Sequence, residues 1–367
     1  MIALRPSSAH IWTQCPGQPV MASRVPKPEP TDPSREGTCA AWVAEMVLTA
    51  TNGLTTSDMI GISHENGWLV TPDMAAHIRR YVEMVRSHGG QIHTERKVRL
   101  NQFVEGTPDA YAVLSAEGTL FADDLKYGYL PVEPYRNPQV SIYVGSIIRD
   151  LMLSGVTITS VQIGIYQPRA WHPSGSYRTW QVSAADLMQY VAEIEAAIPA
   201  TQADSPILKA GEHCEYCPAA ATCAALANAN YRTYDKITSD TQRHMRDDEL
   251  KQELEFLMKA KAMLDGRETA VYAEAEARIA RGAHIPGWHM AERRGARRFK
   301  YDAATIKLLT GGIDPVDKKM VTPAELERRG ADPKIVEKLT EIPRIKPALQ
   351  PIPPGYFTNM FKAKESK

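Results

Sequence analysis

The chain has 367 residues, of which 43% are hydrophobic and 23% are charged. This balance is typical of a folded globular protein and excludes disordered and fibrous chains. Lysine and arginine together number 43, as do aspartate and glutamate, so any affinity for nucleic acid must come from local patches of charge. The length predicts two structural units, because domains usually run to about 100–200 residues.

The N-terminus and the cysteines bear on the cellular compartment. The first residues lack the apolar core of a signal peptide, and no run of about 18 or more apolar residues occurs in the sequence. We therefore expect a cytoplasmic protein that does not contact a membrane. In that reducing compartment the five cysteines are not expected to form disulfides, and their odd number fits four metal ligands and one spare residue.

The first part of the chain alternates between helical and β patterns. Prolines at 25–35 indicate an extended connector before the first long helix. A Thr-Pro pair at 71–72 starts a helix whose apolar residues share one face. In chain order we expect helices at 38–50 and 71–88, three antiparallel strands between 92 and 126, a helix at 138–153, strands near 160–167 and 177–182, and a helix at 183–198. Helices that flank a small mixed sheet give an α/β architecture.

The cysteine-rich segment closes this unit near residue 230, so we divide the chain into a domain at 1–230 and a mainly helical extension at 231–367. Leucines at helical spacing predict one long helix over 247–281. We expect a hairpin at 284–302, then two short helices and a loose, proline-rich end. The segment 281–300 has six basic residues and one acidic residue beside aromatic side chains. This composition suits contact with phosphates and bases as well as it suits a solvated hairpin.

Two carboxylates and a lysine form the candidate catalytic group. Gly-Thr-Pro-Asp ends at Asp109, and Asp124 and Lys126 follow after a turn at 115–119. Residues two apart in a strand point to the same face, so Asp124 and Lys126 project together, and pairing of the strands would bring Asp109 beside them. Mg²⁺ or Mn²⁺ prefers such oxygen ligands and activates water for phosphodiester hydrolysis. Lys126 would orient or deprotonate that water or stabilise charge, whereas the alternative is a hairpin with solvated charges.

Gln139 and Tyr143 are four residues apart in the helix expected at 138–153, so they share one of its faces. An amide and a phenol at that place could meet DNA beside the metal. A surface glutamine and a half-buried tyrosine would explain the same pair without any function.

These motifs, in this order, resemble a known nuclease superfamily. GTPD, DLKYG and NPQVSIY resemble motifs II and III and the Q-x-x-x-Y motif of RecB-like PD-(D/E)XK nucleases, which include the CRISPR adaptation nucleases and lambda-type exonucleases. The segments SSAHIWTQCPG, REGT, DLKYGYLPVEPYRNPQ, IYQPR and HCEYCPAAATC resemble more closely a phage and prophage family of presumed nucleases. The resemblance covers residues 5–230 well and the remainder more weakly, through IPGW and KPALQP.

The resemblance implies a PD-(D/E)XK nuclease core with Asp109 and Asp124 as metal ligands and Lys126 as the catalytic lysine. The expected activity is metal-dependent hydrolysis of DNA in phage recombination, replication or repair, inside a bacterial host cell. We expect an exonuclease rather than a sequence-specific endonuclease, because nothing in the sequence resembles a base-reading module. A phage recombination or single-strand-binding protein could be a partner, and the chain could form an oligomer.

Cys214, Cys217 and Cys223 place three thiols within ten residues, and Cys15 is the distant candidate for a fourth ligand. Such a site would close a loop of about 200 residues and so constrain the unfolded chain. One remote and three clustered cysteines resemble the arrangement in RecB-like nucleases that bind a [4Fe–4S] cluster. Zinc is the main rival, and buried cysteines without a ligand come third. Cys39 is the spare and is expected to be buried in a helix.

The sequence departs from the resemblance at the first motif. Related chains have Glu-Gly-Thr followed by a helix with an early metal-binding histidine, whereas here Glu36-Gly37-Thr38 is followed by alanine at position 41. An oxygen-preferring metal accepts a carboxylate instead, and Glu45 lies one helical turn beyond Ala41, with Glu36 as the alternative. If neither is a ligand, the chain would be a DNA-binding or assembly protein that has lost catalysis. A further rival is a zinc-stabilised interaction protein whose Asp-Leu-Lys run is only a hairpin.

Overall fold

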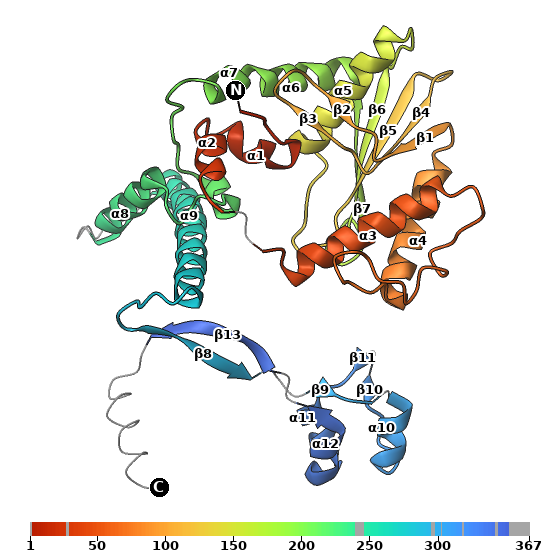
Figure 1. Ribbon diagram of the computed structural model, residues 1–367, viewed down its shortest axis with the longest axis vertical. Coiled ribbons are helices and arrows are strands. Elements are labelled where there is room, and N and C mark those ends of the chain that lie inside the picture. The colour runs from red at the N-terminus through yellow and green to blue at the C-terminus, as the bar shows by residue number, and fades with distance from the viewer. Residues whose placement is uncertain are drawn as a thin grey trace. The chain divides into compact units, whose positions relative to one another are not determined.

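The computed structural model describes residues 2–26, 29–238, 246–294, 298–301, 303–317, 319–341 and 344–351. The chain forms two compact units, residues 1–267 and residues 268–367. The long helix α9 (Asp247–Ala280) crosses the boundary between them and agrees with the helix predicted at 247–281 (Figure 1). Residue 230, where we expected the first domain to end, lies inside the first unit.

The first unit is built on a five-stranded mixed sheet in the order β1-β4-β5-β6-β7 (Figure 1). Neighbouring strands are antiparallel except β5 and β6, which are parallel. The strands are β1 (Gln91–Thr94), β4 (Ala110–Leu114), β5 (Thr119–Leu125), β6 (Ser160–Tyr166) and β7 (Tyr177–Ser183). A small antiparallel ladder of β2 (Val98–Arg99) and β3 (Glu105–Gly106) lies between β1 and β4 in the sequence. The predicted α/β class with a small mixed sheet is confirmed.

Helices supply the apolar layers that bury this sheet. One core cluster contains residues of α3 (Asp32–Thr49) and α4 (Pro72–Ser87), and the other contains residues of α5 (Pro138–Leu153) and α6 (Ala184–Ala196). Each helix begins where a threonine, asparagine or serine side chain accepts a hydrogen bond from a backbone N–H of the first turn. Such caps satisfy donors that have no partner inside the helix, which fixes where each helix starts.

Helix α3 begins six residues before its predicted start at 38. The expectation that prolines would keep the whole segment 25–35 extended is therefore wrong. Pro33 lies in the first turn of the helix, where its missing N–H is not needed, and the Thr31 side chain accepts a hydrogen bond from the backbone N of Ser34.

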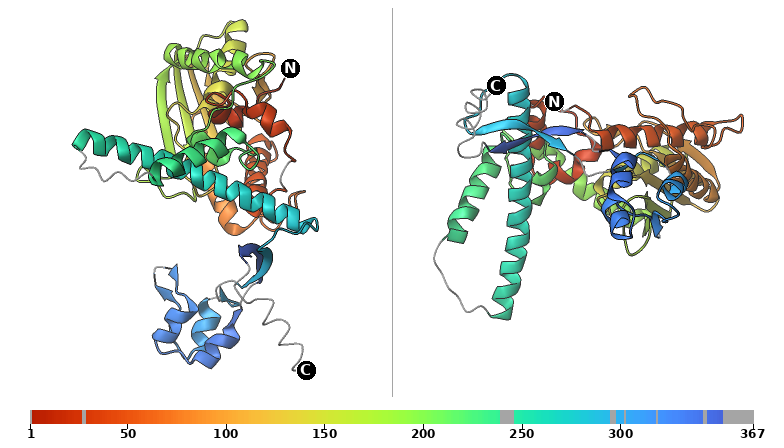
Figure 2. Two further views of the ribbon diagram at one scale, coloured as in Figure 1. Left: turned by 90° about the vertical axis from the view of Figure 1, so that its left-hand side faces the viewer. Right: turned by 90° about the horizontal axis from the view of Figure 1, so that it is seen from below.

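The N-terminal segment folds back beside residues 202–216 of the first unit. It forms η1 (Pro6–Ser8), α1 (Ala9–Trp12) and α2 (Gln18–Ser23), and α1 contacts η2 (Glu212–Tyr216). The backbone N of Ile2 donates to Gln202 Oε1 at 2.9 Å, just after α7 (Ile198–Thr201). Helices α8 (Ala224–Thr238) and α9 follow (Figure 2). This packing brings Cys15 to the cysteine-rich segment 200 residues later.

Among the described residues of the second unit, the two strands within 284–302 do not pair with each other as the expected hairpin would require. Strand β8 (Trp288–Arg294) pairs with β13 (Arg344–Pro351), and β9 (Arg298–Phe299) pairs with β12 (Thr340–Glu341). The prediction is wrong because residues 344–351, which we expected to be loose, take the partner position along β8. The other elements are α10 (Ala303–Leu309), β10 (Val316–Asp317), β11 (Lys319–Met320), α11 (Pro323–Arg328) and α12 (Pro333–Leu339). Within the described part of the chain, no helix combines the length and apolarity needed to cross a membrane.

Candidate functional site

Asp109, Asp124 and Lys126 meet at one end of the β4–β5 pair. Ala110 of β4 lies opposite Asp123 of β5, so Asp109 reaches the end of β5. The backbone N of Leu125 donates to Asp109 Oδ2 at 2.7 Å, and Lys126 Nζ forms an ion pair with Asp124 Oδ2 at 2.7 Å. The alternation along β5 thus places both functional side chains on the face that Asp109 approaches.

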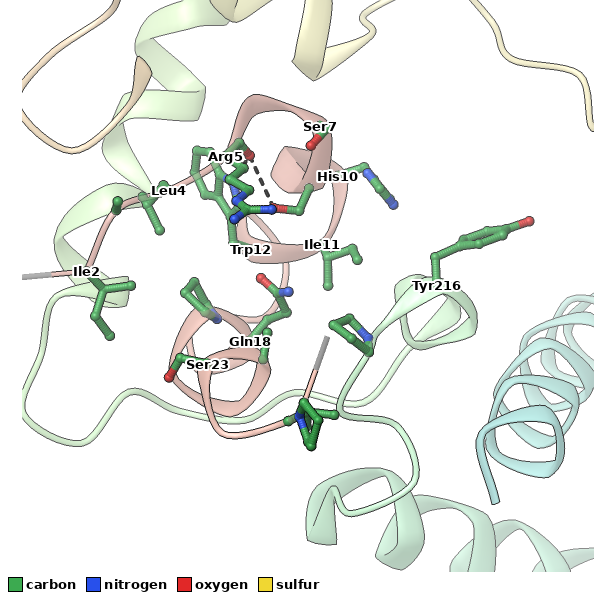
Figure 3. Close-up of a pocket in the computed structure, with 17 residues that line it drawn as sticks. Ile2, Leu4, Arg5, Ser7, His10, Ile11, Trp12, Gln18, Ser23 and Tyr216 are labelled. Atoms are coloured by element: carbon green, nitrogen blue, oxygen red, sulfur yellow. Dashed lines mark hydrogen bonds between the residues drawn. The ribbon is translucent and has the colours of Figure 1, made fainter. Parts of the chain in front are cut away.

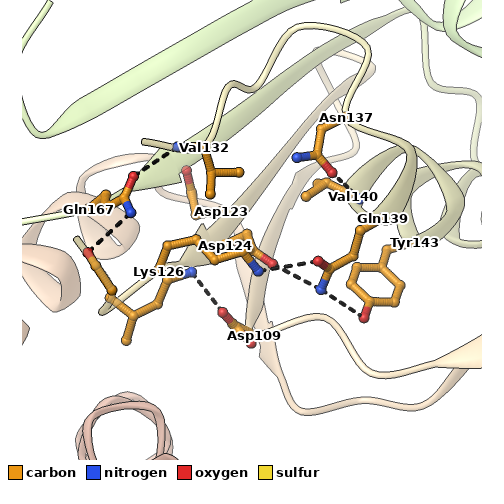
Figure 4. Close-up of polar contacts among 12 residues, drawn as sticks. Asp109, Asp123, Asp124, Lys126, Val132, Asn137, Gln139, Val140, Tyr143 and Gln167 are labelled. Atoms are coloured by element: carbon orange, nitrogen blue, oxygen red, sulfur yellow. Dashed lines mark hydrogen bonds and ion pairs between the residues drawn. The ribbon is translucent and has the colours of Figure 1, made fainter. Parts of the chain in front are cut away.

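Gln139 and Tyr143 complete this group from the start of α5 (Figure 4). Gln139 Oε1 accepts a hydrogen bond from Lys126 Nζ at 3.2 Å, and its Nε2 donates to Tyr143 Oη at 3.3 Å. The Tyr143 ring comes so close to Gly106 that a Cβ there would lie 2.7 Å from Cε1. The glycine of the Gly-Thr-Pro-Asp motif therefore leaves room for the tyrosine of the downstream helix.

The electrostatics of the group decide the protonation of its members. Burial and the neighbouring Asp124 carboxylate raise the pKa of Asp109 to about 7. Burial by itself would lower the pKa of Lys126, but the carboxylates of Asp124 and Asp109 outweigh it and raise that pKa above its usual value. Burial also raises the pKa of Tyr143 to about 12. At neutral pH Lys126 is therefore an ammonium and Tyr143 a phenol, and neither is a ready base.

The structure adds a carboxylate that the sequence analysis missed. Glu95 follows β1, and its backbone N donates to the Asp109 carbonyl oxygen at 3.4 Å. Its φ of 46° lies in the left-handed region, which is uncommon outside glycine. The pKa of Glu95 is raised by burial and by Glu45, and Glu95 in turn raises that of Asp109. It enters the site because it follows the strand that pairs with β4, a pairing that the sequence did not predict.

The two candidates for the first-motif ligand have different surroundings. Glu45 is half-buried in α3 and acts electrostatically on Glu95, so it faces the acidic group. Glu36 forms an ion pair with Arg169 Nη1 at 2.5 Å instead. In the part of the chain that the structure describes, no three His, Cys, Asp or Glu side chains are grouped so as to hold a metal ion. A metal would therefore have to draw the carboxylates closer together.

A buried network supports β5 from its opposite face. Asp123 is 2% exposed and lies between His88 Nε2 and Tyr177 Oη, each 2.8 Å from a carboxylate oxygen. The Tyr81 hydroxyl donates to the Asp123 carbonyl oxygen at 2.9 Å. Buried carboxylates need such partners, and a fully partnered one fixes the strand around it. Asp124 is thereby held toward the other face, where Lys126 lies.

The four cysteines predicted as ligands are neighbours. Cys15 and Cys214 are buried, and Cys217 and Cys223 are half-buried. Burial and the nearby Cys214, Cys15 and Cys223 thiols raise the pKa of Cys217 to about 11. The backbone N of Lys209 is 3.3 Å from Cys15 Sγ, the kind of contact that stabilises a thiolate ligand. Four thiols fit the donor set of an iron–sulfur cluster or of zinc, although no three are as close as bound ligands.

Three further features lie outside both groups. Cys39 is fully buried in α3, as expected of the spare cysteine. A cavity of about 600 Å³ at the N-terminal segment is lined by residues that include Arg5, His10, Trp12 and Tyr216, and none of the predicted site residues lines it (Figure 3). Of the basic segment 281–300, the side chains of residues 292–298, which include four of its six basic residues, lie outside the described part of the chain.

Comparison with known proteins identifies the family. A family model described as "Protein of unknown function (DUF2800)" matches residues 2–353, which is nearly the whole chain. The chain belongs to this DUF2800 family. Among solved structures, a protein from Eubacterium rectale named "Putative exonuclease" matches with a TM-score of 0.32 and 9% sequence identity, over 54% of this chain and 79% of that one. A likeness of that size carries no weight for the fold or activity of the DUF2800 chain.

Proposed function

We propose that this chain is a divalent-metal-dependent deoxyribonuclease with a RecB-like PD-(D/E)XK core, acting on DNA ends during recombination, replication or repair. The observation that supports it is the half-buried acidic and basic group at the end of β5. There Lys126 Nζ lies 2.7 Å from Asp124 Oδ2, and Asp109 accepts a hydrogen bond from the adjoining backbone. Phosphodiester hydrolysis requires oxygen ligands for a hard cation and a positive charge near the transferring phosphoryl group.

Asp109, Asp124 and either Glu95 or Glu45 would hold Mg²⁺ or Mn²⁺. When bound, such an ion polarises the phosphate and lowers the pKa of an attacking water. Lys126 remains protonated beside the carboxylates, so its role is to donate hydrogen bonds to the phosphate oxygens that gain negative charge. Gln139 orients Lys126, and the Tyr143 phenol is a further donor toward the DNA backbone.

We further propose that Cys15, Cys214, Cys217 and Cys223 hold a structural [4Fe–4S] cluster, with zinc as the alternative. The support is the convergence of four cysteines: burial first, and then the charge of the neighbouring cysteines, raises the pKa of Cys217 and Cys214. A bound cation would remove that repulsion and stabilise the thiolates. The cluster would tie the N-terminal segment to the cysteine-rich segment at 214–223 and would have no part in the reaction.

A second candidate function is a DNA-binding protein of the same fold that has lost catalysis. Two observations favour it: position 41 is alanine, and no three metal-binding side chains are grouped in the described residues. The two functions differ in whether DNA is degraded when Mg²⁺ or Mn²⁺ is added.

The Asp124→Asn variant tests the proposal, because the change is nearly isosteric but removes a charge that would bind metal. We expect cleavage of labelled DNA with Mn²⁺ or Mg²⁺ to fall about 100-fold or more, with folding and DNA binding retained. Asp204→Asn, at an exposed position, is the matched control and should cleave normally. Linear and closed circular substrates are compared, since only an endonuclease cuts the circle. Equal cleavage by Asp124→Asn and wild type would refute the assignment.

A further inference from the structure

A buried glutamine connects two loops beside the candidate catalytic group through hydrogen bonds. The first loop follows β5 and ends at Asn137, and the second joins β6 to β7. Gln167 opens the second loop and is 1% exposed. Its Nε2 donates to the carbonyl oxygens of Gly128 at 3.2 Å and Leu130 at 2.7 Å, and its Oε1 accepts from the backbone N of Val132 at 3.0 Å (Figure 4).

A buried arginine adds further hydrogen bonds to the same two loops. Arg178 of β7 is 4% exposed, and its Nη2 donates to Gln167 Oε1 at 2.8 Å and to the Val132 carbonyl oxygen at 2.7 Å. Its Nη1 donates to the Gly175 carbonyl oxygen at 3.2 Å, in the second loop. A guanidinium and an amide are costly to bury unless each is hydrogen-bonded. Here both side chains form hydrogen bonds with backbone groups of the irregular loops. The loops are thereby held in one conformation.

These fixed loops expose three aromatic side chains. Tyr129 is 64% exposed, Tyr135 is 67% exposed and Trp171 is 83% exposed. Large apolar side chains that are exposed on an ordered surface can mark interaction sites. Tyr129 also has the Arg169 guanidinium 4.1 Å from its ring centroid, and Tyr135 meets Trp180 edge to face at 5.4 Å.

The basic side chains among these aromatics already have acidic partners. Arg169 is paired with Glu36 at 2.5 Å, His172 lies 3.1 Å from a carboxylate oxygen of Glu133, and Arg136 is paired with Glu193. A surface that binds DNA phosphates needs cationic side chains that are free to replace the counterions of those phosphates. The exposed rings of these loops suit bases rather than phosphates.

The loops adjoin the reacting end of β5. The backbone N of Lys126 donates to the Tyr166 carbonyl oxygen at 3.0 Å, so the two loops start side by side. Tyr129 is three residues beyond Lys126, a chain distance of at most about 11 Å. A base that rests on the Tyr129 ring would therefore have its backbone within reach of the candidate catalytic group.

We propose that Tyr129, Tyr135 and Trp171 form a stacking platform for the bases of single-stranded DNA that enters the catalytic group. Bases of a single strand expose their faces, whereas those of a duplex are stacked on each other and hidden, so the platform selects single strands. This inference rests on the proposed nuclease function, since it names the form of DNA that the same site would accept. A protein partner at this place would instead cover the catalytic group.

The test is the binding of a fluorescein-labelled thymidine oligonucleotide, compared with an abasic oligonucleotide of the same length. Binding is followed by fluorescence anisotropy in EDTA, so that no cleavage occurs. We expect Trp171→Ala and Tyr129→Ala to weaken binding of the thymidine strand about 5- to 100-fold each, and to leave binding of the abasic strand unchanged. Trp171→Phe, which keeps a ring, should retain most of the affinity and shows that the position tolerates substitution.

Tyr231→Ala is the matched control, because Tyr231 is 69% exposed but belongs to α8, and it should bind both strands like wild type. The platform is refuted if wild type binds the two strands equally, or if Trp171→Ala and Tyr129→Ala bind the thymidine strand as wild type does. Cleavage with Mn²⁺ is measured separately. Ring-dependent binding without cleavage would overturn the nuclease proposal alone, and cleavage without ring-dependent binding would overturn the platform alone.

Discussion

Raising the pH from 6 to 8 should tighten Mn²⁺ binding about tenfold through Asp109. The pKa of this carboxyl is raised to about 7 by burial and by Asp124, and a metal binds only the carboxylate. At pH 6 about one molecule in ten has Asp109 ionised, and at pH 8 about nine in ten do, so the apparent dissociation constant changes by this ratio.

The assay is isothermal titration with Mn²⁺ at both pH values, in two buffers with different ionisation enthalpies. At pH 6 the observed enthalpy should depend on the buffer, because binding releases nearly one proton, and at pH 8 it should not. Asp109→Asn is the control: it should bind weakly at both pH values and show no such dependence. An affinity of the wild-type protein that is flat between pH 6 and 8 would refute the linkage to Asp109.

The same pKa fixes how Asp109 affects stability without metal. Its pKa is higher in the folded protein than the ordinary value of 3.8. The stability that Asp109 adds to the folded protein is therefore fully present below about pH 4 and is lost as the pH rises through about 7. Metal-free protein should therefore melt at a lower temperature at pH 8 than at pH 5.5. Saturating Mn²⁺ should remove most of that difference, as should Asp109→Asn without metal.

Two further predictions concern the cysteines and the first motif. Cys217→Ser should abolish the brown colour and bound iron of anaerobically purified protein and lower its melting temperature, whereas Cys39→Ser should keep colour and iron; stoichiometric zinc without iron would transfer the site to zinc. Glu45→Gln should weaken Mn²⁺ binding about 10- to 100-fold if Glu45 is a ligand, and normal affinity would exclude it. If the Ala41→His variant cleaves DNA and the wild type does not, the natural chain is an inactive DNA-binding protein of the same fold.

Local patterns predicted the parts of the site that depend on one element or on neighbouring elements. Alternation along a strand is enough to place Asp124 beside Lys126, and helical spacing is enough to place Gln139 beside Tyr143. The short turn between β4 and β5 leaves few ways to pair them, so the approach of Asp109 also follows from the sequence. Their roles in catalysis stay predictions.

The features that the sequence did not reveal depend on distant pairing or on unusual backbone. Glu95 enters the site because β1 pairs with β4, and a left-handed residue then turns the chain toward Asp109. The expected hairpin failed because β8 pairs with a strand that begins at Arg344, fifty residues after β8 ends at Arg294. Neither pairing has a turn signal that would set its register.

The neighbouring carboxylates affect each other's protonation and the kind of metal ion that the site would bind. Asp109, Asp124 and Glu95 lie together beside the Lys126 ammonium, and Glu45 adds to their repulsion through Glu95. Without a bound metal, burial and the neighbouring Asp124 carboxylate raise the pKa of Asp109 to about 7 and keep it partly protonated at neutral pH. Position 41 is alanine in this chain, and the carboxylates grouped at the site offer oxygen ligands. Oxygen ligands favour Mg²⁺ and Mn²⁺ over softer ions such as Zn²⁺ and Cu²⁺, so the thiols and the carboxylates should bind different metals in one chain.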